Sequence, residues 1–138
     1  MKVKIDPGSC CRMPEKAHDM DGGFDLFAPE SAVVPARGSA VIDTGVHIQL
    51  PPGTAGLLVS KSGLNIKHNL TSTGLIDQGY TGSIRVKLYN HGDEDYTIEA
   101  GDKISQLVVL KIMDVSLQEV SELDESERGA NGFGSSGR

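Results

Sequence analysis

The sequence predicts an all-β domain built as an antiparallel sandwich or a jelly roll. Turn signals containing Gly, Pro, Asn or Asp recur about every 8–12 residues, which is a spacing typical of these folds. The apolar segments between the turns are short. A chain of 138 residues with 38% hydrophobic and 23% charged residues is long enough for one domain with its own core and is globular rather than disordered.

Runs of apolar and β-branched residues between turn residues mark the strands. A Gly-Gly pair precedes the second run, Pro51-Pro52-Gly53 separates the fifth run from the sixth, and an Ala-Gly-Asp turn precedes the last run. A polar turn at 90–95 follows the hairpin around 74–82. In chain order, strands are predicted at 2–5, 24–27, 33–34, 40–42, 46–50 and 55–60, in the two arms of that hairpin, and at 96–99 and 104–112. Helix is expected only in a short stretch near 62–67 or near 117–123.

The run from Gln106 to Ile112 has no solvent face for several residues. A strand covered on both sides shows this pattern. Two covers are equally consistent with it, namely the second sheet of the same domain or another subunit.

Composition excludes several classes of function. A net charge of −6 argues against a sequence-independent nucleic-acid binder, although it allows a small anionic ligand at a locally basic site. No apolar run approaches the ~18 residues of a membrane span, and no export signal follows the first residues, so a cytoplasmic protein is expected. Cys10 and Cys11 are adjacent, which disfavours a disulfide between them, and the four histidines lack the spacing of zinc ligands.

The hairpin segment Gly74–Gly82 contains the first candidate for a catalytic group. Asp77 directly follows Leu75-Ile76 and is costly to bury unless it meets a partner or takes part in chemistry. The glycines of this hairpin segment are expected to supply positive φ angles and to allow close approach of the backbone. The alternative is an aspartate that only caps the turn.

The last residues differ from the rest of the chain. Segment 122–128 is acidic and 129–138 is rich in Gly and Ser, so we divide the chain into a domain at 1–121 and a tail at 122–138. Such a tail cannot order itself by burying apolar area. The tail also carries Phe133 between glycines, and we expect it to be a lid that orders on binding rather than a merely floppy end.

Five segments in this order resemble the motifs of the homotrimeric dUTPase family. They are 23–28, 60–64, 74–82, 101–106 and 128–137, and together they span nearly the whole chain. The resemblance implies a distorted jelly-roll fold, an obligate homotrimer with active sites at subunit interfaces, and a flexible C-terminal arm swapped between chains. It also implies Mg2+-assisted hydrolysis of dUTP to dUMP and pyrophosphate, which keeps uracil out of DNA and supplies dUMP for dTMP synthesis.

The resemblance also implies roles for individual residues. Asp77 resembles the base that deprotonates the water attacking the α-phosphorus, and Gln106 the second group that holds this water or a phosphate oxygen. Asp25 resembles the carboxylate that holds Mg2+ through its waters. Tyr80 resembles the ring that leaves no room for a 2′-hydroxyl, and Phe133 the aromatic that stacks on uracil. The remaining residues expected to bind the substrate are Lys61, Ser62, Gly63, Thr73, Gly74, Ile76, Ile84, Lys87, Arg128, Gly134, Ser135 and Ser136.

Two lysines depart from the family pattern. Lys61 stands where the second motif usually has arginine, so it offers phosphate a point charge without a bidentate fork. Lys103 replaces the usual arginine of the fourth motif, and we expect it to have a structural role near the turn.

Two alternatives to a dUTPase fit these residues less well. The related deoxycytidine triphosphate deaminases place a catalytic glutamate where this chain has Lys87, which cannot shuttle the required proton. A non-enzymatic nucleotide sensor or structural jelly roll would need neither Asp77 nor the glycine-rich tail.

Overall fold

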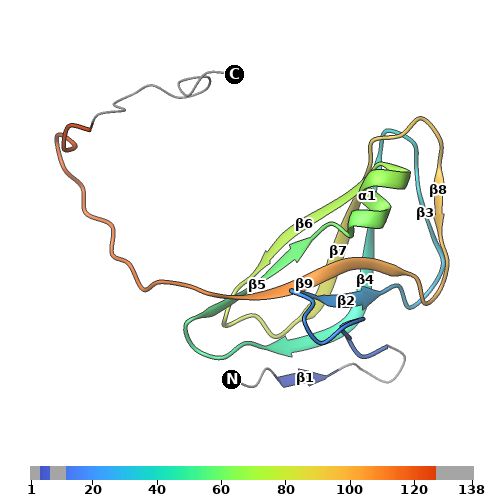
Figure 1. The fold of residues 1–138 in the computed structure, drawn as a ribbon, viewed down its shortest axis with the longest axis horizontal. Coiled ribbons are helices and arrows are strands. Elements are labelled where there is room, and N and C mark those ends of the chain that lie inside the picture. The colour runs from blue at the N-terminus through green and yellow to red at the C-terminus, as the bar shows by residue number, and fades with distance from the viewer. Residues whose placement is uncertain (1–3, 7–11, 127–138) are drawn as a thin grey trace.

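The computed structural model describes residues 4–6 and 12–126. Within them, nine strands and one short helix follow the order predicted from the sequence (Figure 1). The elements are β1 (Lys4–Asp6), β2 (Phe24–Phe27), β3 (Ala32–Val34), β4 (Ser39–Gln49), β5 (Thr54–Val59), α1 (Ser62–His68), β6 (Leu70–Ile76), β7 (Ser83–Asn90), β8 (Tyr96–Ile98) and β9 (Lys103–Lys111).

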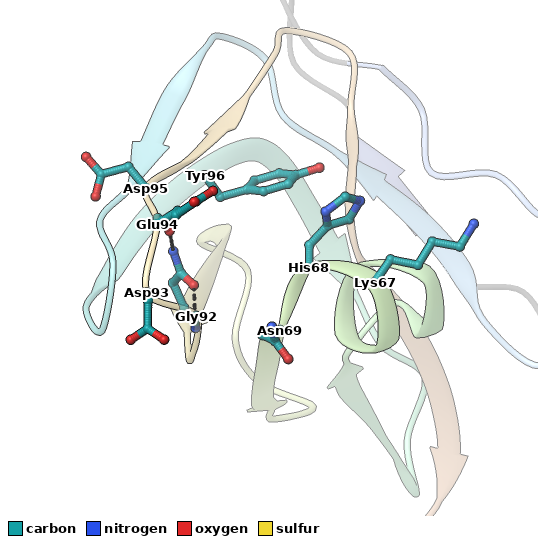
Figure 2. A pocket seen from close by; sticks show the side chains of 9 residues that line it. Lys67, His68, Asn69, Gly92, Asp93, Glu94, Asp95 and Tyr96 are labelled. Carbon is teal, nitrogen blue, oxygen red and sulfur yellow. Dashed lines mark hydrogen bonds between the residues drawn. The ribbon is translucent and has the colours of Figure 1, made fainter.

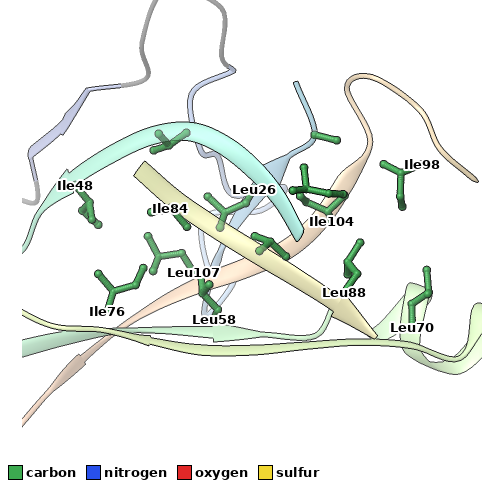
Figure 3. Packing of buried hydrophobic residues seen from close by; sticks show 14 of the residues in the cluster. Leu26, Ile48, Leu58, Leu70, Ile76, Ile84, Leu88, Ile98, Ile104 and Leu107 are labelled. Atoms are coloured by element: carbon green, nitrogen blue, oxygen red, sulfur yellow. The ribbon is translucent and has the colours of Figure 1, made fainter. Parts of the chain in front are cut away.

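Seven strands form one curled antiparallel sheet in the order β1-β4-β7-β6-β5-β9-β2, and β3 pairs with β8 in a second, two-stranded sheet. The core lies inside the curl, where side chains from both halves of the sheet meet (Figure 3). Alternation in β4 and β7 directs Ile42, Val46, Val86 and Leu88 into this core and leaves residues such as Lys87 on the outside. This arrangement is the distorted jelly roll that the sequence predicts.

The structure corrects two details of the predicted elements. The segments 40–42 and 46–50 belong to one continuous strand, β4, in which the register with β7 shifts between Asp43 and His47. The helix forms at the first of the two predicted places, and no helix forms at 117–123.

The helix α1 has weak local signals. Lys61 is its N-cap but makes no side-chain capping bond, and Asn69 ends the helix in the left-handed conformation with φ 55°. Asparagine tolerates this conformation better than most residues. The helix begins shortly after β5, and the left-handed residue at its end turns the chain into β6.

After β9 the chain leaves the sheet. Residues 112–126 form an extended arm without helix or strand that runs away from the body (Figure 1). Met113, Val115 and Leu117 are exposed along it. Among the described residues, no helix has the length and apolar character needed to cross a membrane.

Candidate active site

Strand register brings three of the predicted site residues together. Asp25 on β2 lies opposite Gln106 on β9, and Val59, two residues before Lys61, lies opposite Gln106 on the other side. Gln106 Nε2 donates to Asp25 Oδ1 over 3.2 Å, and Lys61 Nζ donates to the same oxygen over 3.0 Å. We call Asp25, Lys61, Gln106 and Lys103 the β2/β9 cluster.

Lys103 completes the β2/β9 cluster, although the sequence analysis did not count it as a site residue. Its Nζ lies 2.7 Å from Asp25 Oδ2. Lys103 is the first residue of β9, directly after the turn, and its ammonium reaches the carboxylate of the neighbouring strand. Its expected structural role near the turn stays a prediction. The only sequence signal for this contact is the presence of a buried acid and a lysine in facing strands.

The lysines determine the charge state of Asp25. The side chain is only 2% exposed, and burial by itself raises a carboxyl pKa, but hydrogen bonds and charge from Lys103 and Lys61 outweigh burial and lower the pKa of Asp25 below its ordinary value of 3.8. Asp25 is therefore a carboxylate at neutral pH, and with two lysines the cluster has a net charge of about +1. Such a cluster attracts a polyphosphate anion.

The β2/β9 cluster does not suit direct metal ligation. Both oxygens of Asp25 already accept N–H donors. The described part of the chain contains no group of three or more His, Cys, Asp or Glu side chains able to hold a metal ion. The Asp25 carboxylate can still accept a further hydrogen bond, which suits the coordinated water of a Mg2+ ion better than the ion itself.

The β6–β7 hairpin forms a separate group. The backbone N–H of Tyr80 donates to the carbonyl of Asp77 over 3.0 Å, which closes the turn, and the Asp77 side chain is exposed. Beside it lies a cavity of about 230 Å³, which we call the hairpin cavity. Its lining residues are Leu58, Gly74, Leu75, Ile76, Asp77, Tyr80, Ser83 and Arg85.

Sequence reasoning found four of these lining residues, Gly74, Ile76, Asp77 and Tyr80, and missed Leu58, Leu75, Ser83 and Arg85. Leu58 lies on β5, which register alone brings beside β6. Ser83 and Arg85 directly follow the motif, so their position in the sequence was the available signal.

Other predicted site residues lie apart from the cavity. Thr73 and Lys87 are exposed on β6 and β7, and the Lys87 ammonium lies 5.0 Å from the centre of the Tyr89 ring. The side chain of Ile84 is buried in the core, and so is that of Ile76, which lines the cavity, so these two residues can offer a ligand little besides their backbone. Ser62 and Gly63 are exposed at the start of α1. Arg128, Phe133, Gly134, Ser135 and Ser136 lie outside the described residues.

Within one chain, the β6–β7 hairpin and the β2/β9 cluster lie apart. Gln106 lies level with Thr73 two strands away, and Asp77 follows four residues further along. Along a flat sheet, about 3.3 Å per residue and 4.8 Å per strand correspond to a separation of roughly 15 Å between Asp77 and Gln106.

A further pocket of about 330 Å³ lies at the opposite end of β7 (Figure 2). In it the rings of His68 and Tyr96 meet at 4.8 Å, and the Asn90 side chain is fully engaged with the backbone of Val34, Gly92 and Glu94. No residue that the motifs single out lines it.

Three comparisons with known proteins agree. The dUTPase family model matches residues 10–137. The chain is 44% identical to the deoxyuridine 5'-triphosphate nucleotidohydrolase of Clostridium acetobutylicum, over 97% of this chain and 93% of the relative. The corresponding protein of Candida albicans is 41% identical, over 92% of this chain and 82% of the relative.

Solved structures show the same likeness. The Staphylococcus bacteriophage 80alpha dUTPase with dUpNHpp matches with a TM-score of 0.88 and 34% identity, covering 99% of both chains. A mutant dUTPase from phage phi11 of S. aureus, whose structure concerns coordination of a structural Mg(II) ion, matches with a TM-score of 0.81 and 31% identity, over 88% of this chain and 98% of the other. A match along nearly the whole chain, in sequence and in fold, means that the chain belongs to the dUTPase family.

Proposed function

We propose that this protein hydrolyses dUTP to dUMP and pyrophosphate. The observation that carries the proposal is the hairpin cavity, in which an exposed carboxylate, Asp77, lies beside Tyr80 in a chain of the dUTPase family. The relatives that are deoxyuridine 5'-triphosphate nucleotidohydrolases support dUTP as the substrate, and a phage relative was solved with dUpNHpp.

In the proposed reaction, Asp77 accepts a proton from a water molecule whose oxygen attacks the α-phosphorus. The new P–O bond forms as the bond to the bridging oxygen breaks, and pyrophosphate leaves. Lys61 places positive charge against the developing negative charge of the leaving group, and Gln106 holds the water or a phosphate oxygen. The backbone N–H groups of Ser62 and Gly63 lie next to Lys61 and are assigned to the bridge between the α- and β-phosphates.

Mg2+ is the proposed cofactor. Asp25 would hold the ion by accepting hydrogen bonds from its coordinated waters, which agrees with a carboxylate whose two oxygens already accept N–H donors. When bound, the ion neutralises charge on the triphosphate.

Substrate recognition is assigned to the hairpin. Backbone groups from Thr73 to Ile84 would pair with the edge of uracil, and Tyr80 would exclude a ribose 2′-hydroxyl. We assign Lys87 to the substrate on resemblance alone. From the tail 122–138, Phe133 would stack on uracil and Arg128, Gly134, Ser135 and Ser136 would contact the γ-phosphate.

The separation of Asp77 from Gln106 within one chain supports a site shared between subunits of a homotrimer. Exposed apolar residues on the outer face of the sheet support such an assembly: Leu75 is 66% and Leu110 is 42% exposed, with Val108 and Leu57 half-buried between them. A face of this kind typically meets another protein surface. The substrate is a free nucleotide, so the reaction is proposed to take place in the cytoplasm.

The test is product analysis with dUTP, dCTP, dTTP and UTP, each with Mg2+ and with EDTA. We expect dUMP and pyrophosphate from dUTP alone, with the activity lost on chelation. Ammonia from dCTP would instead make the protein a deaminase, and binding of dUTP without turnover would make it a sensor.

A further inference from the structure

Strand β4 is irregular where it passes the hairpin. Its register with β7 shifts between Asp43 and His47, and Gly45 there has φ 67°. The buried Thr44 hydroxyl donates to the Ile84 carbonyl over 2.7 Å and accepts from the Val46 N–H over 3.2 Å. The Thr44 side chain thus takes the place of backbone hydrogen bonds between β4 and β7. The irregularity is therefore stabilised by specific contacts and is a defined feature of the strand.

The irregularity directs the carboxylate of Asp43 at the first residues of β7. Asp43 Oδ1 accepts a short hydrogen bond from Ser83 Oγ and a 3.0 Å bond from the Gly45 N–H, and Oδ2 accepts from Arg85 Nε over 3.3 Å. The Ser83 hydroxyl, followed by the Gly45 N–H, keeps the pKa of Asp43 below its ordinary value. Asp43 is therefore a charged acceptor at neutral pH, and bonds to charged acceptors are the stronger kind.

Ser83 connects this carboxylate to Tyr80. The Tyr80 hydroxyl donates to the Ser83 backbone carbonyl over 2.9 Å. The ring lies directly over Gly82, because a Cβ on Gly82 would be only 2.5 Å from Tyr80 Oη and 2.7 Å from its Cζ. The place of the ring thus depends on the position of Ser83, which Asp43 holds from the neighbouring strand.

We propose that Asp43 is a positioning residue for sugar discrimination, acting through Ser83 to fix the Tyr80 ring in the hairpin cavity. The inference rests on the proposed function, in which this ring excludes ribose. Asp43 and Ser83 belong to none of the five motif segments, and Asp43 does not line the cavity, so it acts on the substrate only through its neighbours.

The test compares kcat/KM for dUTP and for UTP in variants of the full chain. Replacing Asp43 by alanine should lower the preference for dUTP about three- to tenfold, the loss expected for one positioned hydrogen bond. Ser83→Ala should have a similar effect, and Asp43→Asn, which keeps an acceptor oxygen, should recover part of the preference. The substitutions should change the KM values for dUTP and UTP relative to each other. They should leave kcat for dUTP unchanged, because Asp77 and the β2/β9 cluster are untouched.

A matched control is Asp93→Ala. Asp93 is also an exposed aspartate paired with an arginine, Arg37, but it lies beyond the far end of β7. Its loss should leave the preference for dUTP unchanged. A loss equal to that of Asp43→Ala would mean that the effect is general destabilisation.

A double-mutant cycle isolates the route through Tyr80. Tyr80→Phe removes the hydroxyl that bonds Ser83, so combining it with Asp43→Ala should cost little more than either change alone. Fully additive losses, or an Asp43→Ala variant that keeps the parental preference, would overturn the positioning role. A parent protein that fails to hydrolyse dUTP, or hydrolyses UTP equally well, would instead refute the proposed function and the sugar pocket with it.

Discussion

Asp25 shows how one side chain in this protein is stabilised in a charged form despite its burial. Burying a carboxylate is unfavourable unless charge and hydrogen bonds compensate. Lys61 approaches from the N-cap of α1 and Lys103 from β9, and both keep about a third of their side chains exposed, at 28% and 34%. Their ammonium groups can therefore remain partly hydrated while neutralising Asp25.

The lowered pKa of Asp25 predicts an acid-dependent contribution to stability. The unfolded chain binds a proton at Asp25 near pH 4, whereas the folded chain does so only at lower pH. The contribution is therefore complete above the unfolded pKa and is lost as pH falls through the folded pKa. Asp25→Asn should lower the free energy of unfolding by about 1–3 kcal/mol at pH 7, the size of lost hydrogen bonds to a charged group, and by progressively less below pH 4, measured by urea unfolding. An equal cost at pH 7 and pH 3 would contradict this account.

Lys61 provides a second test at the scale of one residue. Lys61→Met removes the positive charge from the proposed phosphate site and should lower kcat/KM for dUTP about 10²-fold. Lys61→Arg restores the fork usual in the family and should retain activity or raise it. Lys67→Met, on the exposed side of the same helix, is the control and should change neither parameter. Normal turnover by Lys61→Met would remove this residue from the mechanism.

At the scale of elements, the packing of the β6–β7 hairpin accounts for two of its three glycines. The expected positive φ angles were wrong, because none of Gly74, Gly79 and Gly82 has one. The expected close approach was right at two of them. A Cβ on Gly74 would lie 3.2 Å from Leu58, and one on Gly82 would overlap Tyr80.

This difference between glycines predicts different effects of alanine. Gly82→Ala should displace the Tyr80 ring and reduce the preference for dUTP over UTP several-fold. Gly79→Ala should change stability and turnover little, because a Cβ there meets no atom within 4 Å and the backbone angle is ordinary. The ratio of kcat/KM for the two nucleotides measures the effect. If both variants behave alike, the approach of Tyr80 to Gly82 does not matter for selectivity.

At the scale of the whole molecule, a single chain has two half-sites. The β2/β9 cluster and the hairpin lie at different positions on the same curled sheet. The proposal that one active site combines these groups from two copies would account for their separation, and the exposed apolar face of the sheet is suited to such contact.

Complementation between inactive chains tests this organisation. Asp77→Asn alone should lower kcat about 10²- to 10⁴-fold with nucleotide binding retained. Trimers refolded from a mixture of Asp77→Asn and Lys61→Met chains should regain activity, because some sites then combine an intact hairpin with an intact cluster. A mixture no more active than its two components would show that each site lies within one chain.

Removal of the tail is a further test at this scale. A chain ending at Leu123 keeps every strand of the sheet and should form the same assembly, as judged by light scattering. Its turnover of dUTP should nearly vanish, because the proposed contacts of residues 124–138 with uracil and the γ-phosphate are gone. Full activity of the shortened chain would exclude the tail from catalysis.

The sequence by itself determined the fold class and the order of the elements. Alternating apolar residues in β7, and the turn residues around Pro51 and Gly101, act through neighbours in the chain, so local reasoning can find them. It also identified Asp77 and Tyr80 by their motif, although their roles stay predictions.

Only the tertiary structure decided which distant side chains meet. Lys103 reaches Asp25 across 78 positions of the chain, and Ser83 reaches Asp43 across 40. Such contacts depend on strand register and on the irregularity at Thr44–Gly45, and a shift of one residue would turn these side chains to the other face of the sheet. The same register separates Asp77 from Gln106, because the curled sheet places them on different strands and at different levels.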